Sequence, residues 1–125
     1  MAPLLQVFDM NKSLSFYRDK IGFQIIQSAG NGNNLDWVLL KLNDVEIMLN
    51  TAFEWNNRPD SPDPLRISNH ADTALYFGCP DIEEAYINLK AKGLELEKPI
   101  ITQYGWKAIY LDDPDGYKIC IHWPI

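Results

Sequence analysis

The feature that most constrains this chain is an internal repeat of one order of predicted elements. Residues 4–8 predict a strand, residues 10–21 an amphipathic helix ending at Gly22, and residues 23–28, 37–42 and 45–49 three more strands. The same order returns at residues 73–78, 82–92, 94–100, 107–111 and 117–123. In an alignment of the two halves, Gly22 matches Gly93 and Trp37 matches Trp106. A lone unit of roughly 50 residues buries its sheet poorly, so the repeat predicts an α+β fold in which two such units form one domain spanning 1–125.

Short polar motifs set the expected ends of these elements. We expect Asn11 to cap the first helix, and Asp81 with Glu84 to form a capping box for the second. Residues 29–34 and the pair at 43–44 predict turns between strands. The run Asp-Pro-Asp-Gly at 113–116 is also turn chemistry, and it lacks the spaced ligands of a calcium loop.

A proline-containing segment separates the two halves. Residues 51–72 hold Pro59, Pro62 and Pro64 and predict a linker between a first module at about 1–50 and a second at about 73–125. Connections longer than about 15 residues are often functional, for example as a lid over a site. Trp55 lies in this linker, where it either closes over a ligand, packs across a dimer interface or has no role.

Composition narrows the classes of function. The 125 residues carry a formal charge of −6 and show no basic patch, which argues against binding nucleic acid. No apolar run approaches the ~20 residues of a membrane-spanning helix, and the N-terminus does not resemble an export signal. Cys79 and Cys120 are the only cysteines, so we expect reduced thiols and a cytoplasmic protein with no membrane partner.

Two motifs carry a family resemblance over nearly the whole chain. The run at residues 9–23 (DMNKSLSFYRDKIGF) and the run at 110–117 (YLDDPDGY) resemble those of the vicinal oxygen chelate superfamily, which contains glyoxalase I, extradiol dioxygenases and bleomycin-resistance proteins. The resemblance implies two βαβββ modules whose strands form an open, cup-shaped half-barrel around the ligand. It also implies a homodimer.

Enzymes of this superfamily hold a divalent metal on four inward-facing side chains, one from each of four strands. Carried over to this chain, the first position is Ala2, and the second is Met48, or Glu46 if the register shifts by two. The third is Asp72 and the fourth is Cys120. Because Ala2 and Met48 are not usual ligands and at best two weak candidates remain of the four, we expect no metal cofactor.

A non-standard metal site remains as the alternative. It would use Glu46, Asp72, Cys120 and His122, whose oxygen, sulfur and nitrogen donors suit zinc. The chain would then be a lyase or dioxygenase of the vicinal oxygen chelate type, with a metal that polarises vicinal oxygens. A further enzymatic reading has Cys120 as a thiolate nucleophile activated by a histidine. The residues assign no catalytic role, so enzymatic activity stays open, with binding favoured.

Strand alternation predicts which side chains line the cup. If the apolar positions 5, 7, 45, 47, 49, 109, 111, 119 and 121 face the helices, the alternate positions face the ligand. The predicted ligand-binding residues are Trp37, Glu46, Met48, Asp72, Tyr76, Trp106, Tyr110, Cys120 and His122. Aromatic faces beside carboxylates suit a flat or cationic organic molecule.

This lining resembles the metal-free bleomycin-resistance branch, whose members are dimers that sequester a cationic antibiotic. The leading hypothesis is therefore a homodimeric protein that sequesters a cationic or aromatic small molecule without a metal. The alternatives are the metal-dependent enzyme and a module whose dimer interface is its function. Trp37 and Trp106 would pack as core residues if the cup is filled by its own side chains.

Overall fold

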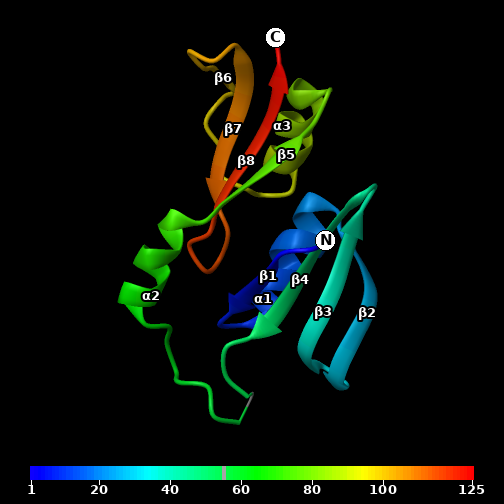
Figure 1. The fold of residues 1–125 in the computed structure, drawn as a ribbon, viewed down its shortest axis with the longest axis vertical. Coiled ribbons are helices and arrows are strands. Elements are labelled where there is room, and N and C mark those ends of the chain that lie inside the picture. Colours follow the sequence, from blue (N-terminus) through cyan, green and yellow to red (C-terminus); the bar gives the residue numbers. More distant parts are fainter. Residues whose placement is uncertain (55) are drawn as a thin grey trace. The chain divides into compact units, whose positions relative to one another are not determined.

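The chain folds into two compact units, Met1–Asp63 and Pro64–Ile125, in a computed structural model that describes residues 1–54 and 56–125 (Figure 1). The first unit contains β1 (Leu4–Val7), α1 (Met10–Leu14), η1 (Ser15–Ile21), β2 (Gln24–Asn31), β3 (Asn34–Leu42) and β4 (Val45–Thr51). The second contains α2 (Pro64–Asn69), η2 (His70–Asp72), β5 (Ala74–Gly78), α3 (Ile82–Ala91), β6 (Ile100–Ile101), β7 (Trp106–Asp112) and β8 (Lys118–Pro124). Each unit has the order βαβββ, which confirms the predicted α+β class.

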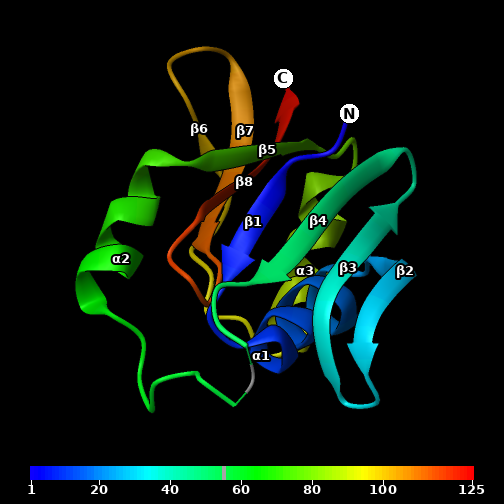
Figure 2. The same cartoon turned by 60° about the horizontal axis from the view of Figure 1, so that its bottom comes forward.

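The two sheets have the same strand order. They run β1-β4-β3-β2 and β5-β8-β7-β6, and in each the first strand pairs parallel with the last strand of its unit (Figure 2). Both sheets are open, because neither returns to its first strand. One face of each sheet packs on a helix, and its apolar residues are buried: Val7, Val38, Leu40, Ile47 and Leu49 in the first unit, and Ile109, Ile119 and Ile121 in the second.

The first helix ends at Gly22 as predicted, but it begins at a different cap and changes its winding along its length. Asp9, and not Asn11, is the N-cap, and its carboxylate accepts hydrogen bonds from the backbone N–H groups of Asn11 and Lys12. The helix then widens into the π-helical η1 and ends at Gly22, whose φ of 111° is left-handed. A π-helix has more residues per turn, so Phe16 and Tyr17 can both be buried although they are consecutive.

The prediction of a strand over residues 94–100 is wrong for most of that range, since β6 contains only Ile100 and Ile101. Ile100 lies opposite Ala108, and continuing that register would place Leu96 opposite Asp112 and Glu97 opposite Leu111. Leu96 would then face outward and Glu97 would enter the helix-packed face. The chain instead leaves the sheet, which buries Leu96 and exposes Glu95 and Glu97.

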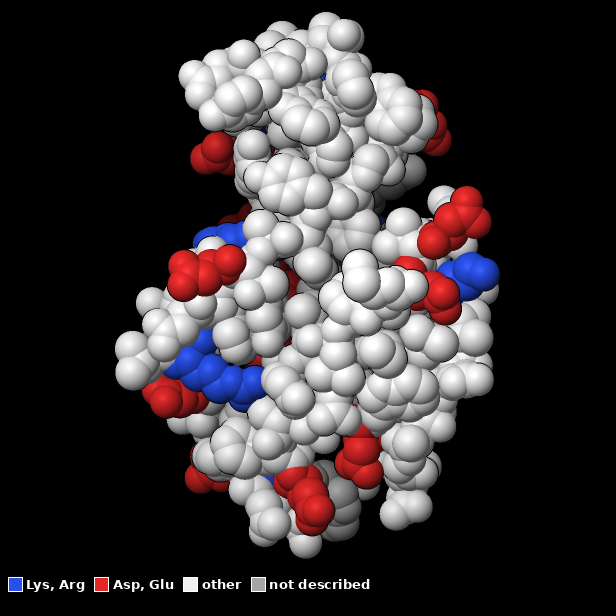
Figure 3. All heavy atoms as spheres, in the orientation of Figure 1, with Lys and Arg blue, Asp and Glu red and all other residues white. Residues whose placement is uncertain are grey.

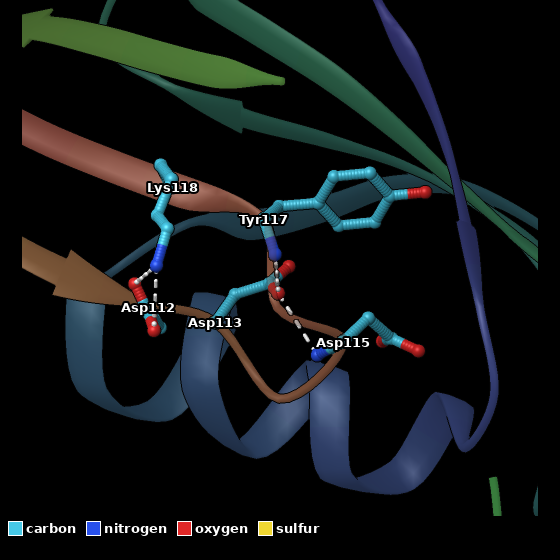
Figure 4. A network of polar contacts seen from close by, with 5 residues as sticks. All are labelled: Asp112, Asp113, Asp115, Tyr117 and Lys118. Carbon is cyan, nitrogen blue, oxygen red and sulfur yellow. Dashed lines mark hydrogen bonds and ion pairs between the residues drawn. The ribbon is translucent and has the colours of Figure 1, made fainter. Parts of the chain in front are cut away.

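The Asp-Pro-Asp-Gly run forms the predicted turn between β7 and β8 (Figure 4). One carboxylate oxygen of buried Asp113 accepts from the N–H groups of Asp115 and Tyr117, each at 2.9 Å. His70 stacks on the Tyr117 ring with centroids 4.0 Å apart, and its Nδ1 lies 2.7 Å from the Asp115 carbonyl. The turn is therefore stabilised by the Asp113 carboxylate within it and by His70 of η2, which packs against it.

Part of the segment predicted as a linker is helical and belongs to the second unit. The helix α2 begins at Pro64, at a first helical position where proline's missing N–H loses no hydrogen bond. The structure follows it directly with η2. Trp55, for which the sequence left three roles open, lies outside the described residues.

Candidate functional site

The strand β8 positions the centre of the candidate site. Its side chains alternate, so Ile119 and Ile121 pack on the helix-covered face while Cys120 and His122 point to the opposite, open face. Cys120 lies directly between Tyr76 of β5 and Tyr110 of β7 in the register. This row of three side chains crosses the sheet.

Three rings gather beside this row, and we call Tyr76, Trp106 and His122 the aromatic cluster. The His122 ring meets Trp106 edge to face, with centroids 4.4 Å apart at 87°, and meets Tyr76 at 5.6 Å and 64°. Its direct cross-strand neighbours are the small residues Gly78 and Ala108, so the larger rings can approach it diagonally. Edge-to-face pairs of this kind stabilise by about 0.5–1.5 kcal/mol each.

His122 contributes an unpaired polar atom to the cluster. Its Nδ1 is buried, and no hydrogen-bond partner exists for it among residues 1–54 and 56–125. Such an atom costs about 1–3 kcal/mol when its desolvation is not compensated. A ligand group that reached it would remove that penalty.

Cys120 is unsuited to the nucleophilic role considered from sequence. The residue is only 2% exposed, and burial raises the pKa of its thiol above the ordinary value, although a hydrogen bond with Tyr110 opposes part of that shift. Burial also raises the pKa of the Tyr110 phenol. Both groups therefore stay protonated near neutral pH, and Cys120 offers packing in place of a thiolate.

A cavity of about 690 Å³ opens beside the row and is called the groove below. Its lining residues are Ala74, Tyr76, Leu94, Glu95, Leu96, Glu97, Tyr110, Leu111, Asp112, Lys118, Ile119 and Cys120. Lys118 is bound to Asp112 at 2.9 Å (Figure 4). Glu95 and Glu97 form no ion pair with any residue that the structure describes, so the groove has an excess of negative charge.

Sequence reasoning missed the acidic wall of the groove. Residues 94–97 read Leu-Glu-Leu-Glu, and this alternation was interpreted as a paired strand. The same alternation also fits an unpaired extended segment that buries leucines on one side. No signal in the sequence separates the two interpretations, because the clash appears only with the register of Ile100 opposite Ala108, which the structure supplies.

The remaining predicted site residues lie elsewhere. Trp37, Glu46 and Met48 occupy one face of the first sheet, where Glu46 lies opposite Lys41 and Met48 opposite Leu39. They are half-buried, and the other face of the same strands holds the core. Asp72 was predicted to face inward from a strand, but it is exposed at the end of η2 and takes no part in the aromatic cluster.

The structure brings only two of the predicted zinc ligands, Cys120 and His122, side by side. Within the described residues, no three His, Cys, Asp or Glu side chains gather closely enough to hold an ion. In the second unit Cys120 and His122 are neighbours on one face of β8. Asp72 ends η2, before Ala74, where the pairing of β5 with β8 begins. His70 donates from Nδ1 to the Asp115 carbonyl, and this contact fixes the orientation of its ring beside the turn.

Charge on the surface follows the composition. On the face drawn in Figure 3, carboxylates are spread widely and the basic groups of the described residues form no continuous patch. Across the part of the chain that the structure describes, every helix is too short or too polar to cross a bilayer.

Comparison with known proteins agrees with the two βαβββ units and the open sheets. These features define a small α+β class built from a duplicated module. The family model for the Glyoxalase/Bleomycin resistance protein/Dioxygenase superfamily matches residues 2–121, so the chain belongs to that superfamily. A search of the curated proteins found no match.

Solved structures share this fold at low sequence identity. A bleomycin-binding protein in complex with bleomycin is 20% identical with a TM-score of 0.73, covering 100% of this chain and 98% of its own. A virulence protein from Salmonella typhimurium is 23% identical with a TM-score of 0.70, covering 100% and 96%. An antibiotic-binding protein from a Streptomyces species is 19% identical with a TM-score of 0.65, also covering 100% and 96%.

Proposed function

We propose that this protein binds a small cationic or aromatic molecule and sequesters it without a chemical step or a metal. The observation that carries the proposal is the aromatic cluster beside the acidic groove. Tyr76 and Tyr110 are 59% and 52% exposed, so their rings are available for stacking or for contact with a cation. The bleomycin-binding and antibiotic-binding proteins of the same fold support this class of ligand.

The lack of an activated nucleophile among the described groups at this site supports binding over catalysis. Among the described groups at this site, the Cys120 thiol and the Tyr110 phenol both have a raised pKa and hold their protons. Asp112 is occupied by Lys118. What remains are ring faces, two unpaired carboxylates and the His122 Nδ1, which are groups that recognise a ligand.

The first test is calorimetric titration and thermal unfolding with metal-free bleomycin, an acridinium dye and a naphthalene sulfonate of similar size. We expect the two cations to bind and the anion to fail. We expect Trp106→Ala to weaken binding of the cations at least tenfold, because a buried aromatic anchor typically contributes more than 1 kcal/mol.

The matched control is Trp123→Ala. Trp123 is on the same strand as His122 and 42% exposed, but it belongs neither to the aromatic cluster nor to the lining of the groove. It should leave the affinity unchanged. Equal losses in the two variants, or no binding of any cation, would refute this site.

The metal-dependent enzyme is the second candidate, and the unpaired Nδ1 of His122 is the observation that favours it. The test is elemental mass spectrometry of untagged protein after exposure to zinc, nickel, manganese and iron(II) and removal of the excess. We expect less than a tenth of an ion per chain. A stoichiometric ion that is lost in His122→Ala would establish the alternative.

A further inference from the structure

One edge of the second sheet is left unpaired along the groove. The Thr102 N–H donates to the Trp106 carbonyl at 2.8 Å, so the backbone groups of Trp106 point toward β6. Those of Ala108, Tyr110 and Asp112 point the same way, since strand backbone repeats every two residues. The strand β6 ends opposite Ala108, and no described residue pairs with Tyr110 or Asp112 on that side.

The chain's own neighbouring segment is a poor partner for this edge. In register with β6, it would bring Glu97 opposite Leu111 on the helix-packed face and expose Leu96. Burying an unpaired carboxylate costs far more than two strand hydrogen bonds return. The edge therefore stays available to a different extended group.

The charges that line the groove favour a positively charged partner for this strand edge. Glu95 and Glu97 on its wall have no ion-pair partner among the described residues, and the one lysine in the lining is held by Asp112. The exposed rings of Tyr76 and Tyr110 lie on the same lining. A volume of about 690 Å³ is within the range of small-molecule sites, roughly 300–1,000 Å³.

We propose that the ligand of this groove is an extended, positively charged, peptide-like small molecule that adds to the edge of β7 as a short strand. This inference rests on the proposed function and names the ligand's chemical class. The Tyr110 N–H and C=O and the Asp112 N–H supply the pairing groups, and Glu95 and Glu97 receive the cationic side groups. Three open residues at about 3.3 Å each span roughly 10 Å, which suits three or four amide units.

The test uses three acetylated, amidated tetrapeptides. The first is Arg-Val-Arg-Val, the second is the same peptide N-methylated at alternate amides, and the third is Gln-Val-Gln-Val. Titrations are followed by ¹⁵N NMR of the whole protein. We expect the first peptide to shift the Tyr110 and Asp112 amide signals and slow their hydrogen exchange, and the other two to bind at least tenfold more weakly.

Two variant pairs locate the contacts. Tyr110→Pro and Tyr110→Ala both lack the phenol, but only the proline lacks the N–H, which points away from β8 and so is not needed by the sheet. We expect the proline variant to bind the arginine peptide about fivefold more weakly than the alanine variant. Glu95→Gln with Glu97→Gln should weaken binding about tenfold, whereas Asp44→Asn with Asp60→Asn, an equal charge change outside the groove lining, should not.

The possible failures are distinguishable. Equal affinity of the methylated and unmethylated peptides would overturn strand pairing, while bleomycin or dye binding lost in Trp106→Ala would leave the proposed function standing. Binding of neither peptide nor any cationic aromatic compound would overturn both. Because methylation alters the probe and leaves the protein unchanged, this comparison holds even if the proline variant does not fold.

Discussion

At the scale of single residues, the buried nitrogen of His122 lowers the stability of the fold but offers a hydrogen-bonding group to a ligand. Its ring packs against Trp106 and Tyr76, yet its buried Nδ1 has no partner in the described chain. A protein selected only for stability would place an apolar ring there. Retaining a nitrogen fits a site in which stability is given up for recognition.

We expect His122→Phe to keep the ring packing and to leave the free energy of unfolding unchanged or up to about 1 kcal/mol higher. Urea unfolding measures this. The same variant should bind the cationic probes more weakly if Nδ1 contacts them. A loss of more than 2 kcal/mol of stability would mean that Nδ1 has a structural partner in solution.

The buried thiol of Cys120 predicts a pH dependence. Burial raises the thiol's pKa in the folded state, so above the ordinary value of about 8.5 the unfolded chain releases this proton first. The unfolded state then binds fewer protons, and stability falls as pH rises. Below about pH 8 the thiol contributes no slope.

Urea unfolding at pH 7 and pH 10 should therefore show a smaller loss of stability in Cys120→Ala than in the native chain. Cys79 is common to both proteins and cancels in the comparison. Parallel pH profiles would indicate that Cys120 ionises equally well in the folded state.

At the scale of elements, the turn between β7 and β8 depends on a glycine packed against the end of α2. Gly116 has a φ of 86°, and a Cβ there would lie 2.5 Å from the Ile67 carbonyl oxygen. Gly105 has a similar φ of 80°, but a Cβ there would meet nothing within 4 Å. Alanine at Gly105 therefore tests backbone strain alone, and alanine at Gly116 tests backbone strain together with steric contact.

We expect Gly105→Ala to lower the free energy of unfolding by about 1 kcal/mol, which is the cost of a left-handed φ. Gly116→Ala carries the same cost and must also displace α2, so we expect a loss of at least about 3 kcal/mol. Thermal or urea unfolding measures both. Equal losses would show that α2 yields without cost.

The sheets also show how elements limit each other. The repeat predicts three strands after each helix, and the first unit forms them at full length, whereas the second shortens its edge strand to two residues. The difference arises because a longer β6 would place the side chains of Glu95 and Glu97 on the helix-packed face of the sheet. The element missing from the second sheet is the reason that the groove exists.

At the scale of the whole molecule, we expect a homodimer. Each unit has an open sheet with exposed apolar side chains outside the groove lining, including Leu4, Ile26 and Ile101, and a second copy of the chain is the simplest cover for such surfaces. Sedimentation equilibrium at micromolar concentration should give twice the chain mass of 14.4 kDa. A monomeric mass at that concentration would contradict this prediction.

The sequence by itself determined the class of fold and, in strands such as β4, β7 and β8, the side that packs on a helix. Periodicity, turn residues and the repeat act locally, so they predicted both βαβββ units, the turn at residues 113–116 and the buried stripe of β8. Local signals also brought Cys120, His122 and Tyr76 to one face, because alternation is a property of the strand itself.

Only the tertiary structure decided which of these residues meet. Trp106 reaches His122 because small residues lie directly opposite the histidine, and Asp72 falls outside the cluster because η2 replaces the start of a strand. The acidic groove likewise depends on the register between β6 and β7, a relation between distant segments. Contacts across strands depend on the packing of the whole sheet, and therefore no local pattern in the chain could specify them.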